Sequence, residues 1–194
     1  MVQRLTFMVL LIAAGFLASG CSASLFKVKP VTELPPLANN AKSVDAGGVT
    51  LRVAPLLTDE ESVELFEANL PVSGVLPVRV ELNYVSGVPP AIKQARFRLR
   101  DDQGREWKLL SPKKAISRIL KANEVYSYNP NSRKNFEREF SAYALDVKTP
   151  LSNAERRRLG FLFFQSPDKR PVASLQKVTL TVERLPQTAT IVLN

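Results

Sequence analysis

Apolar residues alternate with polar ones in several separate segments of this 194-residue chain, and that two-residue period restricts the fold more than any other feature. The clearest segments are 49–53, 78–84, 95–99 and 178–182. Successive side chains of a β-strand point to opposite faces of the sheet, so each segment buries one face and leaves the other in water. The sequence therefore predicts an antiparallel sheet with one wet face.

Three more strands complete the prediction. Residues 106–110 follow a turn at Asp101–Gly104 and continue what has the order of a β-meander. Residues 161–164 are apolar without alternation, which indicates a strand covered on both faces. Ile191 and Leu193 end the chain as a last strand, which brings the expected number to about seven.

Short helices interrupt these strands. Thr58 followed by Glu61 is a capping-box pattern, with Val63 and Phe66 expected on the buried face. Two further helices are predicted from apolar residues at helical spacing, one after Ser111-Pro112 and one over 136–147.

The pattern 152–155 resembles another capping box, and it predicts a third helix in this part of the chain. That helix is expected to run through the arginines 156–158 and to end at Gly160.

The segment 78–107 resembles the immunoglobulin-like domains of many secreted and lipid-anchored bacterial proteins. It carries a V-x-V-x-L-N-x-x-S strand, an F-x-L-x-D strand end and an x-x-G-x-x-W hairpin. The resemblance implies a mainly β, Ig-like antiparallel sandwich of about seven strands with two or three short helical insertions, occupying residues 47–194. It carries no functional residues, because a fold alone does not define a function.

The first 20 residues have the layout of a secretion signal. Arg4 precedes an uncharged apolar run over 5–17, which is shorter than the roughly 20 residues of a membrane-spanning helix. The segment 17–21, Leu-Ala-Ser-Gly-Cys, resembles the lipobox of bacterial lipoproteins, although Ala18 stands where that pattern favours Leu. The resemblance implies lipidation of Cys21 and, with Ser22 following it, an outer-membrane location facing the periplasm. The alternative is an ordinary signal peptide.

Residues 21–46 contain several prolines and little periodicity, so we expect them to form a flexible tether between the lipid and the folded domain.

Composition excludes several kinds of chemistry. The chain has no His, its one Cys is Cys21, and both Met lie within the first 20 residues. Catalysis by Ser/His/Asp or Cys/His, haem ligation and zinc sites built from Cys and His are therefore excluded. The S-x-x-K spacings at 111–114 and 174–177 lack the companion motifs of penicillin-recognising enzymes. We expect no enzyme activity, metal or cofactor, and a carboxylate-based hydrolase stays as a remote alternative.

Charge gives the remaining signal, because the formal net charge is +9 and it is unevenly distributed. Acidic residues dominate 59–67, and basic residues gather later in the chain. The surface expected to attract an anionic partner comprises Lys113, Lys114, Arg118, Lys121, Arg133, Lys134, Arg156, Arg157 and Arg158. Tyr126 and Tyr128 lie in a polar loop beside it and are candidate recognition residues. The alternative is a solvated basic surface without a partner.

These features favour a lipid-anchored cell-envelope protein that acts as a non-catalytic interaction or structural module. Its expected partners are the membrane, reached through the N-terminal lipid, and an anionic envelope polymer or protein. Nucleic acid fits the charge but not the compartment. The alternative is an accessory or carrier protein that handles envelope lipid or polysaccharide.

Overall fold

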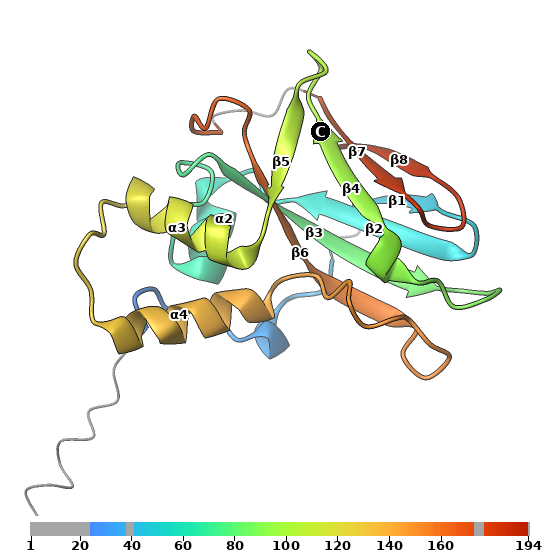
Figure 1. Ribbon diagram of the computed structural model, residues 1–194, viewed down its shortest axis with the longest axis horizontal. Helices are drawn as coiled ribbons and strands as arrows, with labels where there is room; N and C mark the ends of the chain where they lie inside the picture. The colour runs from blue at the N-terminus through green and yellow to red at the C-terminus, as the bar shows by residue number, and fades with distance from the viewer. Residues whose placement is uncertain (1–23, 38–40, 173–176, 194) are drawn as a thin grey trace, which may run out of the picture.

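The computed structural model describes residues 24–37, 41–172 and 177–193 (Figure 1). The described strands are β1 (Lys42–Asp45), β2 (Val49–Pro55), β3 (Val75–Tyr84), β4 (Arg96–Arg100), β5 (Glu106–Leu110), β6 (Arg157–Gln165), β7 (Val178–Glu183) and β8 (Ala189–Leu193). The described helices are α2 (Asp59–Phe66), α3 (Pro112–Ala122) and α4 (Pro130–Ala142), with short 3-10 turns η1 (Val31–Glu33) and η2 (Ile92–Gln94).

The strands form one antiparallel sheet in the order β1-β2-β3-β6-β5-β4-β7-β8. The sheet curls until its edge strands β1 and β8 lie in contact, and the Gln187 N–H donates to the Ala46 carbonyl at 3.1 Å beside them. In Figure 1 the curled strands occupy one side of the molecule and α3 and α4 the other. The fold is thus a nearly closed, barrel-like sheet with helices on its outside.

This architecture confirms the predicted mainly β, antiparallel class and refines its details. Eight strands lie in the described residues, compared with the seven or so expected, and they follow one continuous order. The β4–β5 hairpin is present. The expected meander is wrong at its first step, because β3 lies between β2 and β6 and does not pair with β4.

Two apolar cores lie on opposite faces of the central β3–β6 pair. The sheet core fills the inside of the curled sheet and includes Leu51, Val80 and Leu180, each fully buried. The helix core fills the space between the outer face and the helices, and includes Phe140 and Phe163, whose rings stack with centroids 4.7 Å apart.

The outer face of β3 therefore departs from the prediction of one wet face. Arg79 and Glu81 point away from the sheet core, yet they are only 7% and 6% exposed. The reason is tertiary, since other parts of the chain cover that face.

The start of α2 confirms the predicted capping box. The Thr58 hydroxyl accepts from the Glu61 N–H at 3.2 Å, and the Glu61 carboxylate accepts from the Thr58 N–H at 3.2 Å. The predicted buried face is wrong in one residue, because Val63 is 45% exposed. Ser62 turns inward in its place, and its hydroxyl donates to Ala68 and accepts from Leu70.

The two helices of the middle third are present. α3 begins at Pro112, as its sequence predicts. α4 begins earlier than the apolar spacing indicates, because Asn129 caps it and Pro130 occupies its first position. It ends at Ala142, so Val147 lies beyond the helix.

The helix predicted between residue 152 and Gly160 is wrong. The Glu155 N–H does donate to the Ser152 hydroxyl at 3.0 Å, but the chain then enters β6 at Arg157. Gly160 is a strand residue at which another segment crosses closely, since a Cβ there would lie 2.5 Å from the Leu145 Cα. These residues form a strand because β6 pairs with β3, and this partner lies far away in the sequence.

Parts of the stretch predicted to be a flexible tether contact the body in the described residues, while η1 buries no side chain. Residues 24–37, which we name the strap, run across α2 and α4, and β1 belongs to the sheet. The Lys29 N–H donates to the Leu65 carbonyl at 2.9 Å, and the buried Tyr143 hydroxyl donates to the Lys29 carbonyl. Val28 and Leu37 are 7% and 4% exposed. The predicted signal over 1–20 and Cys21 lie outside the described residues.

Candidate anion-binding surface

Helix α3 presents a basic face to solvent. Its eleven residues include Lys113, Lys114, Arg118 and Lys121 and contain no acidic residue. Its apolar residues are buried in the helix core, and they are Ala115, Ile116, Ile119 and Leu120. Lys114, Ser117 and Lys121 recur at spacings of three and four residues, which places them together on the opposite side.

Two shallow hollows of about 330 Å³ each flank this face. The first lies between α3 and the ends of β5 and β6, and it is lined by Lys108, Leu110, Lys114, Ser117, Arg118, Lys121 and Gln165. The second lies towards the start of α4, and it is lined by Ser117, Leu120, Lys121, Val125, Tyr126, Tyr128 and Arg133. Ser117 and Lys121 line both hollows, so the two form one extended depression, which we name the α3 surface.

The cations of the α3 surface are of two kinds. The arginines are held by the fold, since Arg118 donates to the carbonyls of Ser73 and Lys169, each at 2.9 Å. Lys108, Lys114 and Lys121 are exposed and form no ion pair with any residue in the described ranges. The lysine charges therefore face water and stay available to an anion.

Arg133 fixes the tyrosine side of the depression. Its Nε donates to Glu137 at 2.7 Å, its NH1 donates to the Tyr128 hydroxyl, and its Cζ lies 5.2 Å from the Tyr128 ring centroid. The hydrogen bonds to Glu137 and Tyr128 raise the pKa of Arg133. Tyr126 is 75% exposed beside this pair. Two aromatic rings thus line the same cationic hollow, with Tyr128 held by Arg133 and Tyr126 exposed to solvent.

The structure brings together only part of the predicted basic set. Lys114, Arg118, Lys121, Arg133, Tyr126 and Tyr128 line the α3 surface. Lys113 and Lys134 are exposed on α3 and α4 and line neither hollow. Arg156, Arg157 and Arg158 lie at the opposite end of β6, about 26 Å from Gln165 at 3.3 Å per strand residue.

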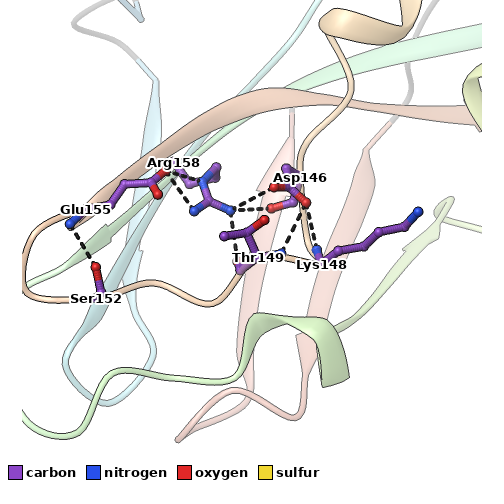
Figure 2. Close-up of polar contacts among 6 residues, drawn as sticks. All are labelled: Asp146, Lys148, Thr149, Ser152, Glu155 and Arg158. Carbon is purple, nitrogen blue, oxygen red and sulfur yellow. Dashed lines mark hydrogen bonds and ion pairs between the residues drawn. The ribbon is translucent and has the colours of Figure 1, made fainter.

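Arg158 in particular is not a surface residue. It is 7% exposed, and its guanidinium contacts Glu155 at 2.8 Å and Asp146 at 3.5 Å. It also donates to the Asp146 and Thr149 carbonyls at 2.8 and 2.9 Å (Figure 2). Arg158 therefore holds the 146–155 loop against β6, and its guanidinium is paired with carboxylates and carbonyls of the protein itself.

The two neighbouring arginines are also engaged. Arg157 donates to Glu81 at 3.0 Å, and the Cζ of Arg156 lies 5.7 Å from the Tyr84 ring centroid. The first contact joins β6 to β3, and the second joins β3 to the residue just before β6. Of the three arginines adjacent in sequence, only Arg158 is buried, while Arg156 and Arg157 are exposed and also contact β3.

Sequence reasoning missed Lys108 and Gln165. Lys108 is one of two charged residues in a five-residue strand, and Gln165 ends another strand. Their Cα atoms are partners in the β5–β6 register, which places them side by side next to α3. Only the pairing of two strands far apart in the chain reveals that they share a site.

Comparison with known protein families, curated proteins and solved structures finds no match. Among the helices that the structure describes, none has the length and hydropathy that a membrane span requires. Within residues 24–37, 41–172 and 177–193, no three acidic side chains gather in a way that could hold a metal ion.

Proposed function

We propose that this protein is a lipid-anchored module of the bacterial cell envelope that binds an anionic polymer through the α3 surface, without catalysing a reaction. The single observation that carries the proposal is the extended depression lined by two tyrosines and by three lysines that form no ion pair within the described part of the chain. Two hollows that share Lys121 fit a chain with repeating negative charge better than a single small anion. Exposed aromatic rings beside cations are also common at recognition surfaces.

The strap supports an anchored arrangement close to a membrane. Its first residue, Ser24, is three residues after Cys21, and Phe26 packs on Phe136 of α4 with ring centroids 5.1 Å apart. Three residues span at most about 11 Å. A lipid on Cys21 would therefore hold the folded body close to the membrane leaflet in which the lipid is inserted, with α4 near the anchor. Loss of fatty-acid label in Cys21→Ser is the expected result of metabolic labelling.

The anion-binding proposal is tested by reversing charge on the α3 surface. We expect the double variant Lys114→Glu/Lys121→Glu of the full-length protein to bind lipopolysaccharide at least about thirtyfold more weakly than the wild type, because losing the attraction of each lysine alone is worth about 1 kcal/mol. The affinity of the wild type is expected to fall as salt is raised, because the contact is between exposed charges.

The matched control is Lys93→Glu/Lys148→Glu, which makes the same change of net charge at two exposed positions outside both hollows. We expect it to bind as the wild type does. Equal loss in both double variants would contradict a local site. Binding only to phosphatidylglycerol vesicles, and not to lipopolysaccharide, would assign the surface to the membrane.

The alternative functions have weaker support. A carrier for lipid requires a large apolar cavity, whereas buried side chains of the sheet core fill the inside of the curled sheet. A carboxylate-based hydrolase requires a general acid with a raised pKa, whereas the hydrogen bond from Lys29 lowers the pKa of Glu64. Glu61 is occupied by the capping box.

The immunoglobulin-like relationship also stays a proposal. It is supported by the alternating strands of 78–107 and by Trp107, which is 8% exposed in the sheet core. The single curled sheet departs from the two-sheet arrangement of that fold.

A further inference from the structure

A pocket separate from the two hollows of the α3 surface lies on the outer face of the sheet. It has a volume of about 230 Å³ and lies between the end of the strap, the end of β2 and helix α2. Its apolar wall includes Pro35, Leu56, Leu65 and Phe161, and Arg79 is the one cation among the described residues that line it. No part of the proposed polymer-binding function uses this pocket.

Arg79 has an unusual environment for an arginine. It projects from the middle of β3 and is 7% exposed. Its NH2 donates to the Pro35 carbonyl, while its buried Nε has no hydrogen-bond partner among the described residues. No acidic side chain in the described residues lies within ion-pair distance of it. Burial lowers the pKa of its guanidinium.

The nearby acid offsets this charge only in part, because its carboxylate raises the pKa of Arg79 by less than burial lowers it. Glu81 lies two residues along β3, and its Oε2 is 3.0 Å from Arg157 and 3.6 Å from Arg52. Positive charge therefore exceeds negative charge on this part of the sheet. A buried cation that is only partly compensated is costly, and an anion that reached the guanidinium would lower that cost.

We propose that this pocket binds a small organic monocarboxylate, with its carboxylate on Arg79 and its apolar body against Phe161 and Leu65. The arginine fork matches the geometry of a carboxylate. The remaining wall is largely apolar, which favours an aliphatic body over a sugar or a nucleotide. Glu61 and Glu64 also line the pocket, and their charges disfavour a ligand that carries a second negative group.

The test measures binding of hexanoate to the full-length protein by NMR titration, with hexanol and hexylamine as the uncharged and positively charged analogues. We expect saturable binding of hexanoate and much weaker binding of both analogues. Arg79→Met is expected to weaken hexanoate binding about thirtyfold, the range of a charge-assisted hydrogen bond. Arg98→Met, which removes an arginine from β4 outside the pocket, is the matched control and should bind as the wild type does.

A second variant guards against a folding defect in Arg79→Met. Ala54 is paired with Arg79 in the β2–β3 register and lines the pocket, so Ala54→Phe fills the space and leaves the guanidinium in place. It should also weaken hexanoate binding. The proposal is overturned if hexanoate does not bind saturably, if hexanol binds equally well, or if either pocket variant retains wild-type affinity. None of these results bears on the α3 surface, whose own variants test it separately.

Discussion

The two ends of β6 are both rich in positive charge, but they use it in opposite ways. At the Arg157 end, Arg157 pairs with Glu81 while staying exposed, and Arg158 is buried against Glu155 and loop carbonyls (Figure 2). At the Gln165 end, lysines of β5 and α3 face water without an ion pair in the described residues. The charge that a cluster of basic residues presents to water thus depends on which acids and carbonyls the fold brings to it.

The largest expected effect concerns the close crossing at the Arg158 end. Gly160→Ala places a Cβ 2.5 Å from the Leu145 Cα, and both are backbone-fixed atoms that cannot move cheaply. We expect a loss of about 3 kcal/mol in the free energy of unfolding, measured by urea denaturation. Gly104→Ala is the control, because no atom lies within 4 Å of its Cβ position and only its φ of +74° opposes the change. Its expected loss is about 1 kcal/mol, and equal losses would contradict the crossing.

The next effect tests whether Arg158 is structural. Arg158→Met removes its contacts with Glu155 and with two loop carbonyls, so we expect a loss of about 2 to 3 kcal/mol in the free energy of unfolding. The control Arg100→Met removes an exposed pair with Glu106 at 3.8 Å and should cost at most about 0.5 kcal/mol. Binding of lipopolysaccharide should be unchanged in folded Arg158→Met. Weaker binding of lipopolysaccharide without a loss of stability would mean that Arg158 takes part in binding, and would contradict its structural role.

A third effect concerns pH and the strap. Burial raises the pKa of Tyr143 from 10.0 to about 12, so between these values the unfolded chain releases its phenol proton before the folded chain does. The unfolded state then binds fewer protons, and the free energy of unfolding falls as pH rises, by up to about 2.7 kcal/mol. Tyr143→Phe should remove this part of the fall between pH 10 and 12, measured by urea denaturation at each pH. Tyr126→Phe, at an exposed ring, should leave it in place.

The smallest expected effect is that of substitutions on the α3 surface on the free energy of unfolding. Lys114→Ala/Lys121→Ala removes two exposed charges that form no described ion pair, so the free energy of unfolding should change by less than about 0.5 kcal/mol. The same variant should bind lipopolysaccharide more weakly. A large loss of stability would mean that these lysines hold the fold, as Arg158 does, and would remove the contrast between the two ends.

The fold was predictable where the information is local. Alternation located β2, β3, β4, β7 and β8, because a strand with one buried face must alternate. The capping box located the start of α2, because its two hydrogen bonds join residues three apart. The same motif at Ser152 failed, since β3 offers the following residues a strand partner that outweighs one local hydrogen bond.

The candidate site was predictable only in part, for the same reason. The basic helix and its tyrosine loop are continuous in sequence, so Lys114, Lys121 and Tyr126 were found together. Lys108 joins them through the β5–β6 register, and the Arg79 pocket exists because the strap crosses β3. Neither the β5–β6 pairing nor the contact of the strap with β3 produces a periodic pattern in the sequence.

The sequence alone determined the class of the fold, the chemistry that is excluded and the sign of the charge, because composition and periodicity act residue by residue. It also led to the prediction of an anchor at Cys21, which lies outside the described residues. Tertiary structure decided the order of the strands, the packing of residues 24–37 as a strap, and which cations reach water. The physical reason is that the charge on a surface depends on which distant acids, carbonyls and strands lie beside it, and chain folding alone sets those distances.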